Sequence, residues 1–230
     1  MGLATSTSTT GAGGSMPPRA GLSSGPDNAR LAQLKAAPRR PGEASFFFYE
    51  AHFKSEAVKV LPGEYFVDNH DIVILTTLGS CIAACLWDRR AGVGGMNHFM
   101  LPEGGSDSGR YGSYAMEMLI NEMMRRGAAR GSLEAKVFGG GQVVGGMNSL
   151  NVGERNTAFV LDYLKTERIP VVSKDVLDIY PRKVCFLPHS GRAMVKRLAS
   201  ANTEALLAQE RAAERIASPK AATGGSIDLF

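Results

Sequence analysis

The sequence is poor in cysteine and has no long apolar run. Its three cysteines (Cys81, Cys85 and Cys185) cannot all pair within one chain, and no CxxC occurs. Neither a disulfide framework nor a redox motif is therefore indicated, and reduced thiols are expected. No run approaches the roughly 18 consecutive apolar residues of a membrane-spanning helix. A basic region followed by an apolar stretch, as in a secretory signal, is also missing. We expect a cytoplasmic protein without a membrane span.

The net charge is small outside the first 45 residues. The net charge is +4, of which residues 1–45 carry +3 and residues 199–230 carry −1, which leaves +2 for the segment between them. A nearly neutral core is a poor electrostatic match for a polyphosphate backbone, so we expect no nucleic-acid partner. Apolar residues make up 44% and charged residues 21%, which excludes a wholly disordered chain.

Composition divides the 230 residues into two tails and one core. Residues 1–45 contain no aromatic residue and are rich in Ser, Thr, Gly, Ala and Pro, which predicts a disordered tail with at most a weak helix near Leu31–Leu34. Aromatic residues begin abruptly at Phe46. We therefore expect a single folded domain over residues 46–198. Residues 199–217 suit a surface helix, and residues 218–230 are expected to be disordered.

Within the core, short strands mix with two helices. Apolar residues at helical spacing predict a helix over residues 113–126, between a capping Ser113 and Gly127, and a second over residues 152–165. Runs of β-branched and apolar residues predict strands at 72–77, 81–87, 93–101, 133–138, 169–173, 183–187 and 193–198. This irregular order favours an α+β fold over a regularly alternating α/β fold.

The stretch from Thr76 to Pro102 holds the candidate chemistry. Its polar segment, residues 88–92, predicts a turn between two apolar strands. With a two-residue loop at Arg89-Arg90, Cys81 lies opposite His98, and opposed side chains are about 4.5–5.5 Å apart at Cβ. A register shift of one residue would move His98 to the other face of the hairpin.

A thiol beside an imidazole makes a nucleophile, because the imidazole takes the thiol proton and stabilises the thiolate. The thiolate of Cys81 could attack a carbonyl carbon to form an acyl-enzyme that water later cleaves. Backbone N–H groups of the Gly79-Ser80 turn could stabilise the oxyanion. The alternative is that Cys81 is merely a small buried residue, as we expect for Cys85 and Cys185. The spacing of Cys81, Cys85 and His98 fits none of the usual zinc patterns.

Two further motifs are interpreted as structural. Residues 138–141 (Phe-Gly-Gly-Gly) lack the Lys and the Ser or Thr of a phosphate-binding P-loop. They suit a tight strand exit that packs near the active cleft. Arg155-Asn156 lies in the first turn of the second expected helix, where we expect it only to fix the local backbone.

At these residues the sequence resembles the CheD family, the chemoreceptor glutamine deamidases of bacterial and archaeal chemotaxis. The resemblance spans roughly Val60 to Leu198 and departs from the family at Leu177-Asp178, where many members have Gly-Gly. Five signatures carry it in order: Leu78-Gly79-Ser80-Cys81, residues 94–102 (GGMNHFMLP), residues 136–140 (KVFGG), residues 152–156 (VGERN) and Pro181-Arg182-Lys183-Val184.

The resemblance implies a mixed β-sandwich with flanking helices, related to toxin-type glutamine deamidases. By the same resemblance, Cys81 matches the family nucleophile and His98 the general base. A threonine just upstream of the cysteine orients the histidine in the family; Thr76 and Thr77 are the candidates, and we favour Thr76. No metal or organic cofactor is implied. The implied partners are the cytoplasmic helices of chemoreceptors and, in some organisms, a CheC-type phosphatase.

The leading hypothesis is hydrolytic deamidation of receptor glutamine side chains to glutamate through a Cys81 acyl-enzyme. A second hypothesis is hydrolysis of glutamyl methyl esters on the same receptors, which the same acyl chemistry permits. The third is a non-catalytic adaptor that binds receptors or a phosphatase. An intact Cys81 and His98 argue against the adaptor.

Overall fold

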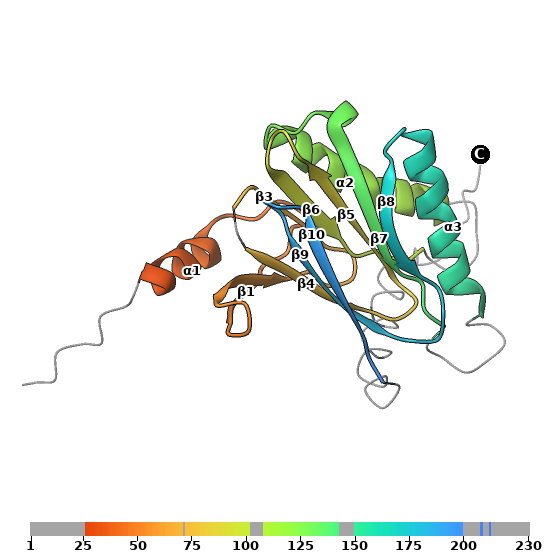
Figure 1. Ribbon diagram of the computed structural model, residues 1–230, viewed down its shortest axis with the longest axis horizontal. Helices are drawn as coiled ribbons and strands as arrows, with labels where there is room; N and C mark the ends of the chain where they lie inside the picture. The colour runs from red at the N-terminus through yellow and green to blue at the C-terminus, as the bar shows by residue number, and fades with distance from the viewer. Residues whose placement is uncertain are drawn as a thin grey trace, which may run out of the picture.

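Two mixed five-stranded sheets face each other and form the body of the molecule (Figure 1). The structure is a computed structural model that describes residues 26–70, 72–101, 108–142 and 150–199, with Ala208 and Ala212. The first sheet has the order β1 (Phe46–Glu50), β2 (Ser55–Lys59), β4 (Val73–Leu78), β9 (Arg182–Leu187) and β10 (Arg192–Arg197). The second has the order β3 (Tyr65–Asp68), β6 (Val93–Asn97), β5 (Ile82–Asp88), β7 (Leu133–Gly139) and β8 (Val171–Val176).

Helices α2 (Ser108–Arg125) and α3 (Leu150–Thr166) cover the outer face of the second sheet (Figure 1). The predicted apolar face of α2 is confirmed, because its central methionines and aliphatic residues are fully buried in this outer cluster. The helix begins five residues earlier than Ser113, and the 3₁₀ turn Arg130–Ser132 follows it. No helix in the described part of the chain is long and apolar enough to cross a membrane. The expected α+β sandwich with flanking helices is confirmed.

The core between the sheets contains both sulfur and aromatic side chains. Cys85 of β5, Met96 of β6 and Cys81, the residue before β5, belong to it, and β4 and β9 contribute Ile74 and Phe186 from the opposite sheet. All five are at most 1% exposed. Burial on this scale provides most of the stability of a small domain. The candidate residues therefore lie inside the sandwich, between its sheets.

The seven predicted strands are present, and three more were missed. Strand β6 ends at Asn97, earlier than predicted, with an isolated bridge between Ile82 and Phe99 beyond it. The missed strands, β1, β2 and β3, have four or five residues each. Runs this short give little periodicity, so pairing with neighbours rather than the local pattern makes them strands.

The prediction of a disordered tail is wrong for residues 26–45. Helix α1 (Pro26–Ala36) packs Leu31 and Leu34 against the core between the sheets, and Ala44 is fully buried. The guanidinium of Arg39 lies 4.5 Å from the ring centroid of Phe47. Composition missed these contacts because the burial comes from the sheet and not from the segment itself. Residues 1–25 and nearly all of 200–230, including the expected surface helix, lie outside the described residues.

The departure from the family at Leu177-Asp178 coincides with unusual backbone geometry. Both residues have left-handed conformations, with φ of 64° and 69°. A side chain in this region costs about 1–2 kcal/mol, whereas glycine adopts it without strain. The glycines common in the family at these positions are therefore explained by the turn that this chain also makes.

Replacing Leu177 with glycine should stabilise the protein by about 0.5–1 kcal/mol. The relief of backbone strain exceeds the roughly 0.5–1 kcal/mol that glycine adds to the entropy of the unfolded chain. Urea unfolding measures the change. The matched control is Ile179→Gly, which should destabilise, because Ile179 is exposed and has no left-handed φ to relieve. Equal changes in the free energy of unfolding for the two substitutions would contradict backbone strain at Leu177.

Candidate active site

The hairpin that carries the candidate dyad has a longer loop than predicted. Strand pairs such as Leu86 with Gly95 and Asp88 with Val93 show that facing residues sum to 181, not 179. The two-residue loop is therefore wrong: four residues, 89–92, connect the strands. The carboxylate of Asp88 accepts hydrogen bonds from two of their amides, and Gly92 closes the turn with φ of 63°.

This register places Cys81 opposite Met100 and His98 opposite Ala83. A shift of two residues preserves the face, because side chains alternate with a period of two. Cys81 and His98 are therefore diagonal neighbours on the face between the sheets, about 7–8 Å apart along the backbone and closer at Cβ. Diagonal neighbours at this separation are within reach of aromatic side chains such as imidazole. Both side chains are buried, with exposures of 0% for Cys81 and 1% for His98.

Thr76 meets His98 from the opposite sheet. Its hydroxyl lies 2.8 Å from Nδ1 of His98 and also 2.8 Å from the carbonyl oxygen of Val60. A carbonyl can only accept, so the single hydroxyl proton of Thr76 goes to Val60 and the Thr76 oxygen accepts from Nδ1–H. This arrangement fixes the tautomer in which Nε2 is the basic nitrogen of His98. Thr77, the other candidate, points to the opposite face of β4 by strand alternation.

Replacing Thr76 with valine should lower the turnover number for deamidation by about 10–100-fold. Valine keeps the shape but removes the group that fixes the imidazole orientation, and small misplacements of a catalytic group are costly. Steady-state kinetics on a receptor fragment measure the loss. Thr77→Val is the matched control, the same change one residue along β4, and should stay near the wild-type rate. Equal rates for both variants would contradict a role for Thr76.

Three successive carbonyls fix the turn that carries Cys81. Those of Gly79 and Cys81 accept hydrogen bonds from the amides of Gly141 and Gly140, at 2.7 and 2.8 Å. The carbonyl of Ser80, between them, accepts one from the side chain of Asn156 at 2.9 Å. The end of β7 and the first turns of α3 therefore determine where the sulfur lies.

The glycines after β7 are required by close approach as well as by conformation. Gly139 and Gly140 have φ of 111° and 66°. A Cβ on Gly139 would lie 2.1 Å from the carbonyl oxygen of Cys81, and one on Gly140 would lie 2.9 Å from the carbonyl oxygen of Gly153. Real Cβ atoms do not approach this closely. The interpretation of residues 138–141 as a tight strand exit beside the candidate site agrees with this packing.

Arg182 explains another of the sequence signatures. Its guanidinium is fully buried and donates to Asp175 and to the carbonyls of Tyr180 and Leu177. Burial by itself would raise the pKa of Asp175, but hydrogen bonds from Arg197 and Arg182 hold that pKa below its usual range. In this loop, the amide of Leu177 donates a hydrogen bond to the carbonyl of Gly139, and the carbonyl of Asp178 accepts one from the amide of Gln142. Arg182 thus stabilises the loop that is hydrogen-bonded to residues 139–142, next to the turn of Cys81.

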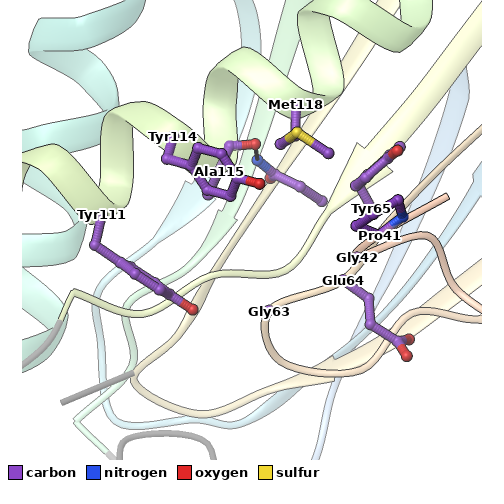
Figure 2. A pocket seen from close by; sticks show the side chains of 10 residues that line it. Pro41, Gly42, Gly63, Glu64, Tyr65, Tyr111, Tyr114, Ala115 and Met118 are labelled. Atoms are coloured by element: carbon purple, nitrogen blue, oxygen red, sulfur yellow. Dashed lines mark hydrogen bonds between the residues drawn. The ribbon is translucent and has the colours of Figure 1, made fainter. Parts of the chain in front are cut away.

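A pocket of about 120 Å³ lies between α2 and the chain leading into β3, and neither Cys81 nor His98 lines it (Figure 2). The amide of Gly63, in its wall, donates to the carbonyl of His98 at 2.7 Å. The hydroxyl of Tyr111 points toward Gly63 (Figure 2). Burial raises the pKa of Tyr111, and the charge of Cys81 raises it further.

The other candidates from the sequence, two cysteines and a zinc site, are distinct from the Cys81–His98 dyad. Cys85 and Cys185 are buried, as predicted, and burial raises the pKa of both thiols. Within the ranges that the structure describes, no three His, Cys, Asp or Glu side chains gather as metal ligands. No sequence pattern indicated a role for Tyr111, because this residue precedes the expected start of the helix. It did mark Asn156, but only as a local backbone contact.

The chain is similar in sequence to curated proteins of one family. A family model described as CheD chemotactic sensory transduction matches residues 100–197. The probable chemoreceptor glutamine deamidase CheD 1 of Albidiferax ferrireducens is 63% identical over 203 residues, which is 87% of each chain. The corresponding probable deamidase of Methylobacillus flagellatus is 50% identical over 81% of this chain and 96% of its own. A solved Neisseria meningitidis protein of family DUF152 aligns with half of the chain at 14% identity and a TM-score of 0.33. On the identity to its curated relatives, the chain belongs to the CheD family.

Proposed function

We propose that this protein deamidates glutamine side chains on the cytoplasmic helices of chemoreceptors, with Cys81 as nucleophile, His98 as general acid and base, and Thr76 orienting His98. The observation that carries the assignment is the contact of 2.8 Å between Thr76 and Nδ1 of a histidine on the same face as Cys81. The curated relatives, named probable chemoreceptor glutamine deamidases, supply the substrate class.

The first half of the reaction forms a thioester. The basic Nε2 of His98 takes the proton of Cys81, and the thiolate attacks the side-chain amide carbon of a glutamine. The tetrahedral intermediate collapses when His98 returns a proton to the amide nitrogen, and ammonia leaves. Thr76 holds the ring so that the same nitrogen performs both transfers.

The second half releases glutamate. His98 takes a proton from water, the resulting nucleophile attacks the thioester carbon, and the carbon–sulfur bond breaks. The thiolate of Cys81 recovers a proton, and the receptor carries a carboxylate where an amide stood. Protein side chains and water perform every step, so the proposal requires no cofactor.

Substrate access requires movement, because Cys81 and His98 are buried in this structure. We place the approach at the pocket in Figure 2, because the amide of Gly63 in its wall is hydrogen-bonded to the carbonyl of His98. A glutamine side chain entering there meets the dyad from the side of β3.

Mass spectrometry of a receptor cytoplasmic fragment tests the function. Wild-type protein should add about one dalton at specific glutamines, since an amide becomes an acid through the acyl-enzyme. Loss of methyl groups from a premethylated fragment, without a gain at glutamine, would instead indicate the esterase. Binding without any change of mass would indicate the adaptor and would overturn the enzymatic proposal.

The proposed setting follows from the substrate. Receptor cytoplasmic helices are reached only in the cytoplasm, so we place the protein there. The family resemblance also proposes a CheC-type phosphatase as a second partner, which co-purification from a strain that encodes one would test. We place the catalytic unit in residues 26–198, because α1 packs onto the sandwich core.

A further inference from the structure

The hydrogen bonding between β5 and β6 is irregular near the candidate nucleophile, where the amide of Ala84 bonds to the side chain of Asn97 and Ile82 and Phe99 form an isolated bridge. Ile82 and Phe99 exchange two backbone hydrogen bonds, both of 2.9 Å. In an antiparallel pair such exchanges recur at every second residue, so the next should join Ser80 to Leu101. Cys81 lies between these two positions. The geometry of this one step of the ladder therefore controls the placement of the sulfur.

The side chain of Asn156 stands where that backbone bond should be. Its Oδ1 accepts the amide proton of Leu101 at 2.9 Å, and its Nδ2 donates to the carbonyl of Ser80 at 2.9 Å. These are the donor and acceptor that would otherwise bond to each other. A side-chain amide thus replaces one direct bond with two and separates the strands by its own width.

Asn156 lies on helix α3, and burial of its side chain confines the amide to this place. Asn156 is fully buried. Close approach of Gly140 to Gly153, where a Cβ on Gly153 would lie 2.4 Å from the carbonyl oxygen of Gly140, brings the helix near enough for Asn156 to enter the ladder. An amide is suited to the place because it offers one donor and one acceptor in the same plane, as a peptide group does.

We infer that Asn156 is a positioning residue for the deamidation reaction: its amide holds β5 and β6 apart at Cys81 and so sets the sulfur relative to His98. This inference rests on the proposed function of the Cys81–His98 pair. Without the amide, Leu101 can bond directly to Ser80, the strands close, and Cys81 moves. A local backbone role would affect stability alone.

Kinetics of Asn156→Ala and a control test the inference. At a temperature where every variant is folded, Asn156→Ala should lower the turnover number on a receptor fragment by about 10–100-fold with KM within about twofold, because placement and not binding is lost. The matched control is Thr157→Ser, at the adjacent buried residue of α3, which keeps the hydroxyl that bonds to Gly153 and packs against Gly140. It should keep the wild-type turnover number.

Asn156→Asp adds a readout that a structural role would not move. An ionised carboxylate can accept from Leu101 but repels the carbonyl of Ser80, whereas a protonated carboxyl donates to it as the amide does. Burial raises the pKa of such a carboxyl, so protonation occurs at mildly acidic pH. The rate of Asn156→Asp relative to wild type should therefore rise as pH falls, while the rate of Thr157→Ser relative to wild type stays constant. If the rate relative to wild type does not change with pH for either variant, the inference is overturned.

A crystal structure of Asn156→Ala decides the matter independently of the receptor. A direct bond between Leu101 and Ser80, with Cys81 displaced from its wild-type position relative to His98, supports the inference. An unchanged Cys81–His98 arrangement overturns it, even where the wild-type protein deamidates the receptor normally. Failure of the wild-type protein to modify any glutamine would reject the proposed function and, with it, the role of Asn156 in that reaction.

Discussion

Replacing Cys81 with alanine should abolish receptor deamidation, whereas the same substitution at Cys85 should leave most of it. Loss of a covalent nucleophile removes the acyl-enzyme route and typically lowers the rate by roughly 10³-fold or more. Mass spectrometry of a receptor fragment after incubation with each variant measures the difference. Circular dichroism should show both variants folded.

Cys85 is a closely matched control. It lies on β5, four residues after Cys81, on the same face and in the same core between the sheets. It is 1% exposed, and burial raises the pKa of its thiol far above neutrality, so it does not supply a thiolate. Its replacement should cost about 0.5–3 kcal/mol of stability, the usual range for a core substitution, with little effect on the rate.

Three results would contradict the assignment of Cys81. Retained deamidation in Cys81→Ala would show that another group attacks the glutamine. Unfolding of Cys81→Ala under conditions where Cys85→Ala stays folded would indicate that Cys81 is a structural core residue. Equal loss of activity in both variants, with both folded, would place the reaction elsewhere in the sandwich.

Replacing Gly139 with alanine should destabilise the protein by about 2–5 kcal/mol and impair deamidation in the molecules that remain folded. A left-handed φ of 111° costs an alanine about 1–2 kcal/mol. The new Cβ would also lie 2.1 Å from the carbonyl oxygen of Cys81, and forcing an atom into packed structure adds about 1–3 kcal/mol. Relief of that clash requires Cys81 to move.

Gly127→Ala is the control that separates the steric clash at position 139 from the strain of a left-handed backbone. Gly127 has a similar φ of 95°, but a Cβ there would meet nothing within 4 Å. It should therefore cost only the roughly 1–2 kcal/mol of the backbone conformation and leave the rate of deamidation unchanged. Urea unfolding and kinetics on the same preparations measure both effects. Equal stability losses in the two variants would show that the Cβ at position 139 does not press on Cys81.

The sequence determined which side chains share a face. Alternating apolar residues around the polar turn at residues 88–92 predicted a hairpin with Cys81 and His98 on one side. The loop was two residues too short in that prediction, yet the conclusion about the face held, because strand alternation repeats every two residues. Local periodicity likewise predicted α2 and α3, and runs of β-branched and apolar residues predicted seven strands.

Only the tertiary structure decided which groups complete the site. Thr76 and Thr77 are equivalent in sequence until β4 packs across the sandwich and places Thr76 on Nδ1 of His98. Asn156 is far along the chain and enters the ladder only because α3 packs against the end of β7. Interactions between distant segments leave no local period to read. The sequence therefore supplies the reactive groups, and packing between elements sets their separation and orientation.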